Sequence, residues 1–362
     1  MAEIKGLNPH DYPPEVIRQL FKRYQKYEIS AIESDPGIVD LQKLDLGDLP
    51  DSITLAGTML GSDLRAAFEH FTMMERPEQP DSNIKDVPVF TLPSVSGLHV
   101  IPSLFPPFVQ LHLLSRLFHR DLSNPNHRTN IHLHYDVTYP SETNNIRHSS
   151  ACGSHDDTMA SFFRDDPARK LSPKEPGVHK SISIRSFLDQ RLRWLTLGGQ
   201  YNWTAKEYPA TQSPSFPEDI GRLLRAIFPE TEGQAAVVNL YSAGDTMGVH
   251  RDVSEECDAG LISVSLGCEG LFLIGHDRED GCEIIRLRSG DTLYMTGKSR
   301  FAWHAVPKVL PSTCPSWLRD WPVAFAGLPE GHLADPVSRD WQGWISRKRI
   351  NLNVRQMTSR ER

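Results

Sequence analysis

The segment NLYSAGDTMGVHRD, residues 239–252, carries the first candidate metal ligands of this sequence, because it ends in a histidine and a carboxylate separated by one residue. In an extended segment residues i and i+2 point to the same face, so His250 and Asp252 can offer an imidazole nitrogen and a carboxylate oxygen to one ion. Two histidines and one carboxylate with open positions suit a non-haem Fe(II) centre that uses O₂, and Zn²⁺ or Mn²⁺ compete on ligand type alone. Taken alone, the triplet also fits a surface turn with a hydrogen-bonded histidine.

A third ligand and a candidate anion site follow downstream. The stretch GDTLYMTGKSRFAWH, residues 290–304, starts at a turn dipeptide, continues as an apolar run and ends in His304, as expected for a strand that delivers a late ligand. The segment RINLNVR places Arg349, Asn351 and Arg355 on one face of a strand. Its six intervals span about 20 Å at roughly 3.3 Å per residue, so two inward-leaning arginines could enclose a small dianion. Because a guanidinium donates two parallel charge-assisted bonds to a carboxylate, the expected anion is a dicarboxylate co-substrate.

These motifs together resemble the AlkB family of Fe(II)/2-oxoglutarate dioxygenases, and within it the type called AlkB homologue one. The resemblance rests on four motifs in family order: Asn239-x-Tyr241, His250-x-Asp252, His304 and the segment from Arg349 to Arg355. It extends to RWLTLGGQYNW at 193–203, GLHVIPSLFPPF at 97–108 and, faintly, LFKRYQKY at 20–27, so it covers most of 97–357 with gaps. The HRD triplet of a protein-kinase catalytic loop is excluded, because that loop requires Asn five residues after the Asp, where this chain has Cys257.

The resemblance implies a mainly β (α+β) fold, a double-stranded β-helix (jelly-roll) dioxygenase core with flanking N-terminal helices. It implies Fe(II) held by His250, Asp252 and His304, with O₂ taking an open position. It implies 2-oxoglutarate as co-substrate, bound by Asn239, Leu240, Tyr241, Arg349, Asn351 and Arg355. Arg349 would pair with the far carboxylate and Arg355 would brace the iron end. The reaction implied is hydroxylation of an N-methyl group, which then leaves as formaldehyde.

The substrate-binding residues implied by the resemblance are Trp194, Gly199, Gln200 and Tyr201. Trp194 and Tyr201 are seven residues apart, as the family's base-contacting aromatics are, and an aromatic there can stack on a flipped base for about 1 to 3 kcal/mol. The alternative for Trp194, and the one we favour for Trp203, is an anchor in the core. Members of this type are associated with methylated adenine, so the expected partner is methylated RNA or DNA and the expected function is demethylation of methyladenine (N6 or N1). Ser254 stands where bacterial members have an acid, which leaves the choice of base open.

Two other functions stay open from the sequence. One is the same chemistry on a methylated protein such as a histone, since no residue in the sequence excludes it. The other is a catalytically inactive nucleic-acid-binding module that keeps the barrel. The intact ligand triad and both arginines count against the inactive module, because it would not need all five side chains. Fold class does not separate these functions.

Composition limits the broad class of protein. The 362 residues with 39% apolar content suffice for one large domain or one and a half. A net charge of −7 gives no global attraction to nucleic acid, so such binding requires a local basic face. Residues 347–362 carry six basic residues against one acid, and 185–194 adds three arginines. Solvated surface charge is the alternative explanation for those outside the RINLNVR segment.

Cysteine usage and hydropathy indicate the compartment. The five cysteines are odd in number and show no CxxC pairing, which favours a reducing environment. No apolar run approaches the roughly 18 residues needed to span a bilayer, and no hydrophobic signal core follows the start. We therefore expect the nucleus and/or the cytoplasm, with a mitochondrial pool also compatible, and no membrane partner.

Four regions are predicted along the chain: an N-terminal helical and loop extension (1–96), a helix-containing lead-in with a polar insertion (97–182), the dioxygenase jelly-roll domain (183–357) and a basic tail (358–362). Helices are expected over 14–27, 63–71, 108–118 and 217–228, with loops at 28–60 and 74–96. Order is expected to begin near Phe90, where VFTLPSVSGLHVIPSLF (89–105) should form a strand and turn. At least seven short strands are expected between 235 and 355.

Two segments between residues 126 and 181 fit more than one structure. Residues 140–181 are polar and rich in helix breakers, so we interpret them as an insertion or a lid, with disorder as the alternative. His132 and His134 can share a strand face, but no cysteine or outer ligand supports a closed zinc site. We therefore do not predict a second metal centre there.

Overall fold

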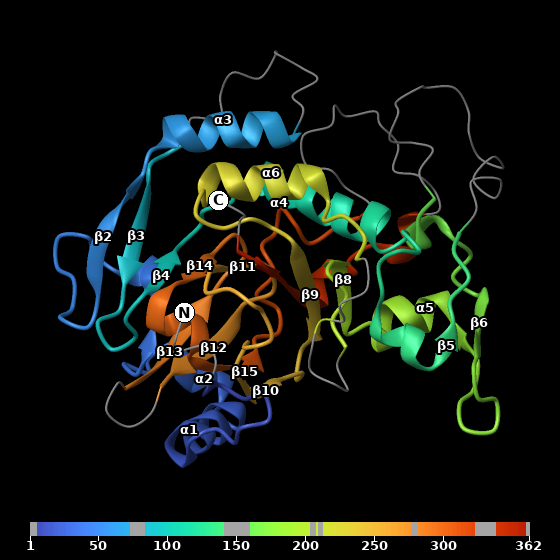
Figure 1. The fold of residues 1–362 in the computed structure, drawn as a ribbon, viewed down its shortest axis with the longest axis horizontal. Coiled ribbons are helices and arrows are strands. Elements are labelled where there is room, and N and C mark those ends of the chain that lie inside the picture. Colours follow the sequence, from blue (N-terminus) through green and yellow to red (C-terminus); the bar gives the residue numbers. More distant parts are fainter. Residues whose placement is uncertain are drawn as a thin grey trace.

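Two antiparallel β-sheets form the centre of the molecule (Figure 1). The computed structural model describes residues 6–72, 84–140, 160–202, 208, 213–276, 281–322 and 338–359. The large sheet contains, in spatial order, β2 (Thr54–Met59), β3 (Val87–Thr91), β4 (Leu98–Ile101), β14 (Thr292–Met295), β11 (Leu261–Gly267), β16 (Lys348–Arg355), β9 (Ala235–Ser242) and β8 (Trp194–Gly198). The small sheet contains β1 (Ile38–Val39), β13 (Cys282–Leu287), β12 (Gly270–Gly275), β15 (Trp303–Val309) and β10 (Met247–His250), with β1 added in parallel to β13. This is the jelly-roll core that the sequence predicts, and all seven predicted strand segments are strands.

Alternation along β16 separates the core from the space between the sheets. Ile350, Leu352 and Val354 belong to the main hydrophobic cluster, whereas the odd-numbered residues point to the opposite face. Register extends this division to the neighbouring strands, since Arg349 lies opposite Tyr241 of β9. Polar side chains are thereby collected on the face that looks toward the small sheet.

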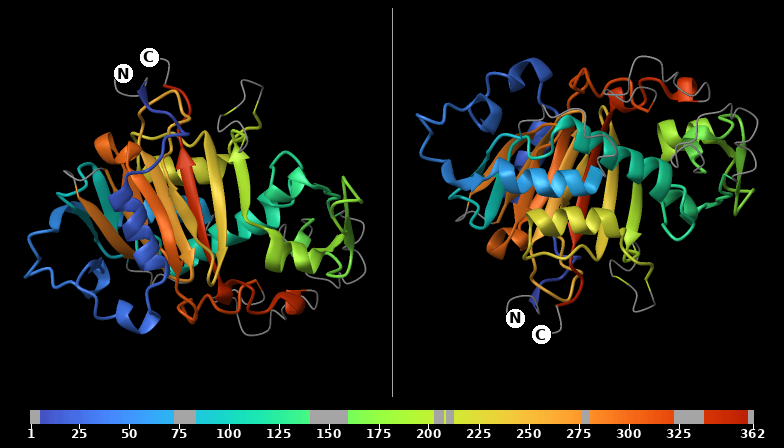
Figure 2. Two further views of the ribbon diagram at one scale, coloured as in Figure 1. Left: turned by 90° about the horizontal axis from the view of Figure 1, so that it is seen from below. Right: turned by 90° about the horizontal axis from the view of Figure 1, so that it is seen from above.

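Three helices cover the other face of the large sheet: α3 (Gly61–Thr72), α4 (Pro107–Ser115) and α6 (Glu218–Ile227) (Figure 2, right). In α6, the residues Ile220, Leu223 and Leu224 are buried, and Pro217 with two acids begins the helix as the sequence predicts. The helix α1 (Glu15–Gln25) packs on the outer side of the small sheet. The helix predicted over 14–27 is confirmed, and it docks on the sheet through Ile17 and Tyr24, which are buried in a cluster that includes Trp303.

A smaller unit, which we call the side lobe, consists of residues 126–140 and 160–193 and lies beside β8 (Figure 1, right). It contains η4 (Asn130–Leu133), β5 (Tyr135–Asp136), η6 (Phe162–Arg164), β6 (Lys170–Pro173), β7 (Ile182–Ser183), α5 (Ile184–Ser186) and η7 (Phe187–Arg191). The lobe is tied to the edge strand of the large sheet, since the amide of Thr196 donates to the carbonyl of Arg128 at 2.8 Å. The remaining short elements are α2 (Ile29–Ile32), η2 (Leu41–Lys43), η3 (Arg116–Asp121), η8 (Gly297–Phe301), η9 (Ser338–Trp341) and η10 (Ile345–Arg347).

The N-terminal region differs from the prediction. The segment 28–60, expected as a loop, contains β2, whereas β3 and β4 lie where a strand and turn are predicted. Both β2 and β3 extend the large sheet, and the predicted boundary at residue 97 falls between the paired strands β3 and β4. The pattern was missed because β2 is an edge strand whose side chains are mostly exposed, so it lacks apolar alternation. In the predicted insertion, residues 141–159 lie outside the described residues, and Lys170–Pro173 forms the central strand of the side lobe. Within the described ranges, no helix combines the length and the apolar character needed to cross a bilayer.

Candidate metal centre and co-substrate pocket

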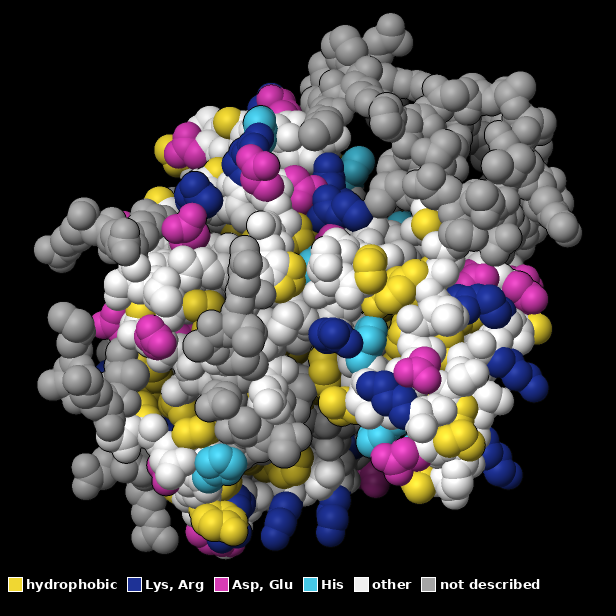
Figure 3. Space-filling model, turned by 45° about the vertical axis from the view of Figure 1, so that its right-hand side comes forward, with side chains coloured by type: hydrophobic (Ala, Val, Ile, Leu, Met, Phe, Trp, Pro, Cys, Tyr) yellow, Lys and Arg dark blue, Asp and Glu magenta, His cyan; other side chains and the backbone are white. Residues whose placement is uncertain are grey.

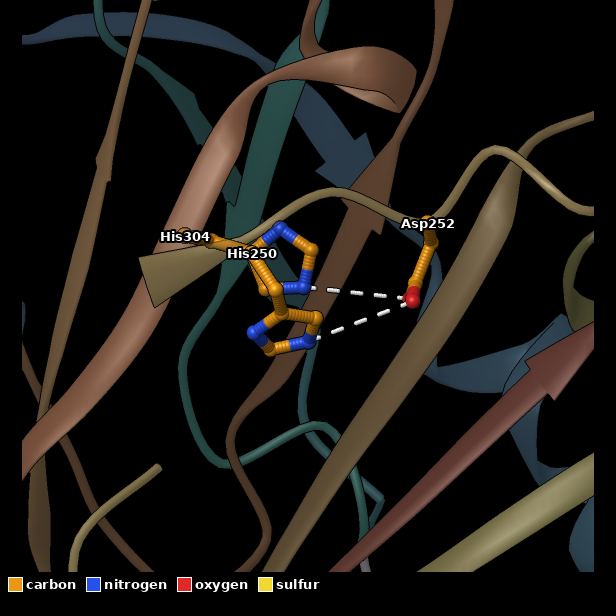
Figure 4. Close-up of side chains that lie close together, drawn as sticks. All are labelled: His250, Asp252 and His304. Carbon is orange, nitrogen blue, oxygen red and sulfur yellow. Dashed lines mark ion pairs between the residues drawn. The ribbon is translucent and has the colours of Figure 1, made fainter. Parts of the chain in front are cut away.

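The three predicted metal ligands meet at the edge of the small sheet (Figure 4). His250 ends β10 and lies opposite His304 of β15, while Asp252 follows β10 by two residues. One ligand atom from each lies within 4.8 Å of the other two. The Nε2 atoms of His250 and His304 are 3.9 and 3.7 Å from the two carboxylate oxygens of Asp252. In the part of the chain that the structure describes, this is the one cluster of three or more such side chains.

Backbone contacts hold both imidazoles in the state that binds metal. Nδ1 of His250 lies 2.9 Å from the carbonyl oxygen of Gly248, and Nδ1 of His304 lies 3.0 Å from that of Ala302. Donation from Nδ1 to these carbonyls leaves both Nε2 lone pairs directed at Asp252. Burial, with the neighbouring charge of His250, lowers the pKa of His304 to about 4, so its ring is neutral near pH 7.

Asp252 is held as a carboxylate by a buried arginine. Arg355 donates from Nη2 to Oδ2 of Asp252 at 2.7 Å. Burial by itself would raise the pKa of Asp252, but the charge of Arg355 holds that pKa well below its usual range. The third ligand is therefore ionised at any pH at which the protein works.

Two further buried charges complete what we call the metal-end network: Asp252, Glu255, Arg300 and Arg355. Arg300 donates to the backbone carbonyl of Asp252 at 2.8 Å and to the Glu255 carboxylate at 2.8 Å. The other oxygen of Glu255 lies 3.3 Å from Nη1 of Arg355. The side chains of Glu255 and Arg300 are each 1% exposed. Sequence reasoning missed both, because they are 45 residues apart and no local spacing connects them.

A cavity between the two sheets adjoins the metal ligands. It is lined by Asn239, Tyr241, Met247, His250, Leu261, Ser263, Phe272, Met295, His304, Ala305, Val306, Arg349, Asn351 and Asn353. The polar members come mostly from β9 and β16, and the apolar members come mostly from the strands around them. Such a site can orient a small polar molecule while excluding bulk water.

Arg349 lies in this cavity as a buried cation without an anion. Its Nη2 donates to Ser265 Oγ at 3.1 Å, and among the described residues no acceptor meets Nε or Nη1. No described carboxylate lies within 4 Å of it, and burial lowers its pKa. An unpaired buried charge is costly, which marks this end of the cavity as a receptor for a carboxylate. Gly270 provides the room, since a Cβ there would lie 2.5 Å from Nε of Arg349.

The other predicted co-substrate residues divide between two faces. Asn239, Tyr241 and Asn351 line the cavity, and Asn351 is held by donation to Ser263 Oγ at 2.7 Å. Asn353, which the sequence analysis did not single out, lines it too, and its Nδ2 lies 3.4 Å from Asp252.

The last two predicted co-substrate residues lie outside the cavity lining. The Leu240 side chain lies in the hydrophobic core, on the opposite face of β9, because adjacent residues of a strand alternate. Arg355 lies at the metal end, as the sequence analysis expects, and its guanidinium is paired with Asp252 and Glu255, whereas Arg349 has no carboxylate partner among the described residues.

The predicted substrate residues also separate. Trp194 lies opposite Asn239 in the β8–β9 pair and is partly exposed. The ring of Tyr201 packs edge-on against Tyr208 with centroids 5.1 Å apart, and the hydroxyl of Tyr208 accepts from Arg355 at 3.1 Å. An aromatic pair therefore adjoins the metal-end network.

Gly199 and Gln200, both predicted to bind substrate, also have local structural roles. The Gln200 side chain accepts from the Arg128 amide and from the Thr196 hydroxyl, and its Nε2 donates to Gly198. Gly199 has no room for a side chain, because a Cβ would lie 2.9 Å from that of Ala235. Trp203 lies outside the described residues.

His132, one of the histidines near residue 130, is held by hydrogen bonds on both sides of its ring. Its Nδ1 accepts from the Thr129 amide at 2.9 Å, which caps η4, and its Nε2 lies 2.8 Å from the Tyr139 hydroxyl. Both ring nitrogens therefore have partners within the side lobe.

Comparison with known proteins places this geometry in a family. Residues 155–355 match the family described as the 2OG-Fe(II) oxygenase superfamily. Over 98% of its length, the chain is 41% identical to the N6-methyladenosine RNA demethylase ALKB1 of Pyricularia oryzae, of which it covers 99%. The chain belongs to the AlkB family of 2OG-Fe(II) oxygenases.

Two further AlkB-family relatives show the extent of the similarity. The N6-methyladenosine RNA demethylase ALKBH of Cryphonectria parasitica is 46% identical over 63% of this chain and 99% of its own length. The tRNA demethylase abh1 of Schizosaccharomyces pombe is 33% identical over 74% of this chain and 82% of its own. The family uses Fe(II), 2-oxoglutarate and O₂, and the ligand triad together with the unpaired Arg349 fits that set.

Proposed function

We propose that this AlkB-family protein is an Fe(II)/2-oxoglutarate-dependent oxidative demethylase of N-methylated bases in nucleic acid, with methyladenine in RNA as its substrate. The observation that carries the chemistry is one cavity with a His-Asp-His triad beside it and a buried, unpaired arginine in it. The relatives named as N6-methyladenosine RNA demethylases, one of them similar over nearly the whole chain, support the substrate.

The roles of the residues follow from their contacts. His250, Asp252 and His304 would hold Fe(II) through two Nε2 atoms and a carboxylate oxygen. When bound, the iron and 2-oxoglutarate supply O₂ activation, with the co-substrate oxidised to succinate and CO₂. Arg349 would pair with the far carboxylate of 2-oxoglutarate through Nε and Nη1, the two donors that lack an acceptor.

The remaining side chains of the cavity would orient the co-substrate and enclose it. Asn239, Tyr241 and Asn351 flank Arg349 with hydrogen-bonding groups, and Phe272 and Met295 exclude water. The metal-end network fixes Asp252 through both its carboxylate and its backbone, so this ligand does not have to be ordered when iron binds.

Tyr201 is our candidate for stacking on the methylated base. A base must leave its stack to reach the metal centre, and an aromatic ring at the entrance offsets part of that cost. The half-buried ring is supported by Tyr208, which is itself bonded to Arg355. A hydroxylated N-methyl group then releases formaldehyde and leaves the unmodified amine.

The test compares methylated RNA, methylated DNA and methylated peptide in parallel, with formaldehyde and succinate as readouts in the presence of Fe(II). We expect RNA to be demethylated, and Tyr201→Ala to lower that activity about tenfold or more, the equivalent of at least 1.4 kcal/mol of stacking. Substrate-free 2-oxoglutarate turnover should persist in the variant. Tyr12→Ala is the matched control, because Tyr12 is 90% exposed on the N-terminal segment.

Three outcomes of these assays would contradict parts of the proposal. Demethylation of the peptide alone would replace nucleic acid by protein as the substrate. Equal RNA activity of wild type and Tyr201→Ala would remove Tyr201 from the base-binding site. Absence of any 2-oxoglutarate turnover would contradict the assigned chemistry.

A further inference from the structure

The side lobe has a charge that is opposite to that of the whole chain. Its two segments, 126–140 and 160–193, contain nine Lys and Arg against five Asp and Glu, whereas the chain has a net charge of −7. Figure 3 shows Lys, Arg and His side chains spread over this side of the molecule, with acids interspersed among them. A polyanion is therefore attracted to this unit and not to the molecule as a whole.

Five of these cations are exposed and have no acidic partner among the residues that the structure describes. They are Arg128, Lys170, Lys174, Lys180 and Arg191, and no described carboxylate lies within 4 Å of any of them. The other cations of the lobe include Arg169, Arg185 and Arg193, which are paired with Asp165, Asp340 and Asp245. Arg128 and Arg191 lie near the lobe's junction with β8, since the Arg128 carbonyl accepts from the Thr196 amide and the Arg191 carbonyl accepts from Asn130. Lys174 and Lys180 lie in the outer turn between β6 and β7.

The outer turn also exposes rings. We call Lys174, Lys180, His134 and His179 the lobe tip. The two imidazoles lie 4.7 Å apart, and Tyr135 donates to the backbone carbonyl of Lys180 at 3.2 Å, so chain segments 45 residues apart are joined here. Exposed Leu133 adds apolar surface, and Glu175 and Asp136 are the acids nearby in sequence. Flat rings beside cations are what unpaired nucleotides contact through stacking and phosphate pairing.

The lobe tip continues from the proposed base-binding side of the cavity. Asn130, at the start of η4, accepts through Oδ1 from the Arg193 amide, next to Trp194. From Asn130 the chain runs through η4 into β5, a path on the order of 10 to 15 Å at about 2 Å per residue of 3-10 helix and 3.3 Å per residue of strand. An unpaired nucleotide spans more than the roughly 3.4 Å of a duplex strand, so that distance corresponds to no more than about four nucleotides.

We infer that the side lobe is a second contact surface for the RNA substrate, binding unpaired nucleotides a few positions from the methylated base through Arg128, Arg191 and the lobe tip. This inference rests on the proposed function for its ligand. It predicts that affinity depends on the length of the RNA beyond the base, while the chemistry at the metal centre does not.

The experiment compares a methyladenosine-containing RNA of about 20 nucleotides with a trinucleotide carrying the same base. For wild type, we expect a lower KM for the longer RNA. Lys174→Ala/Lys180→Ala should raise the KM for the longer RNA about tenfold, leave kcat unchanged and leave the trinucleotide unaffected. The salt dependence of binding should also weaken, with the slope of log K against log salt falling by about 1.4 for two lost phosphate contacts.

The matched control is Lys22→Ala/Lys26→Ala, which removes the same charge from exposed positions at α1, across the molecule from the lobe (Figure 1). If both double variants raise the KM for the longer RNA equally, the effect comes from net charge alone and the inference is overturned. Equal wild-type KM values for the two RNAs would overturn it as well. Lys174 also donates to the His132 carbonyl, so its loss could disturb the fold of the lobe. If the alanine variant is misfolded, Lys174→Gln/Lys180→Gln replaces it, because glutamine removes the charge and keeps a hydrogen-bond donor. Direct binding of unmethylated RNA tests the lobe even if no demethylation is found, so failure of the inference and failure of the proposed function are distinguishable.

Discussion

Arg349 and Arg355 begin and end the polar face of the same strand, and their surroundings are opposite. Both are buried, and both face the space between the sheets. Arg355 contacts the carboxylates of Asp252 and Glu255. Arg349 donates one hydrogen bond to the Ser265 hydroxyl, and two of its nitrogens have no acceptor among the described residues. The two ends of the cavity therefore differ in how their charges are neutralised. At the metal end the charges are balanced within the protein, and at the Arg349 end the balance has to come from a ligand.

This contrast separates stability from binding. A balanced buried network loses stability when one member is removed, because the remaining charges are stranded. An unbalanced cation already costs stability in the free protein, so its removal costs little until the ligand is present. The same substitution at either end of β16 should consequently have different effects on folding and on 2-oxoglutarate.

The largest effect is expected at the metal ligands. His304→Ala removes one of three protein ligands, so turnover should fall below detection, by about a thousandfold or more, while the protein remains folded. Demethylation and far-ultraviolet circular dichroism measure the two properties. His99→Ala, at a half-buried histidine of β4, is the control and should retain activity. Substantial activity in His304→Ala would contradict the ligand assignment.

Arg355→Met tests the balanced end. We expect the free energy of unfolding of the ligand-free protein to fall by about 3 to 5 kcal/mol, since Asp252 and Glu255 lose a buried partner. Urea denaturation measures this loss. Arg222→Met, which breaks the exposed pair with Glu218 on α6, should cost no more than about 1 kcal/mol. If both variants are equally stable, the metal-end network does not stabilise the fold.

Arg349→Met tests the unbalanced end. The ligand-free protein should be as stable as wild type or more stable, while binding of 2-oxoglutarate should weaken by about 2 to 5 kcal/mol, at least 30-fold. At 100 times its Kd, 2-oxoglutarate should add about 2.7 kcal/mol to the unfolding free energy of wild type and nearly none at the same concentration to the variant. A loss of ligand-free stability as large as that of Arg355→Met would erase the contrast between the two arginines.

The smallest effect is expected from Gly270→Ala. The added methyl would lie 2.5 Å from Nε of Arg349, so the guanidinium must shift away from the co-substrate. We expect the KM for 2-oxoglutarate to rise about tenfold with little change in iron affinity. Gly57→Ala on β2 is the control, since its Cβ would meet nothing within 4 Å. An unchanged KM would show that Arg349 has more room than the structure indicates.

The sequence predicted those features in which spacing within one strand or turn sets the geometry. His250 and Asp252 are two residues apart, and the alternation in RINLNVR places Arg349 and Asn351 on one face. The pairing of Glu255 with Arg300 could not be predicted, because strand order brings together residues that no periodicity relates. Leu240 was assigned by its position between Asn239 and Tyr241, and strand alternation turns it into the core.

Local composition does not show the partners of a side chain. Gln200 lies next to Tyr201 in a motif that suggests substrate contact, and the hydrogen bonds that also hold its amide to Arg128, Thr196 and Gly198 could not be predicted. The strand β2 was missed because an exposed edge strand carries little apolar pattern. Both features depend on surroundings that are assembled from distant parts of the chain.

The position of β16 has a consequence for how the protein is made. This strand follows all the others in chain order, yet it lies inside the large sheet between β11 and β9. A nascent chain that has been translated as far as residue 340 thus exposes two unpaired strand edges that will later receive β16. At about 5 to 20 residues per second, roughly 4 to 18 seconds separate synthesis of β11 from synthesis of β16. During that interval the half-built sheet is open to aggregation and to chaperones, and the arginine that would receive the co-substrate has not yet been added.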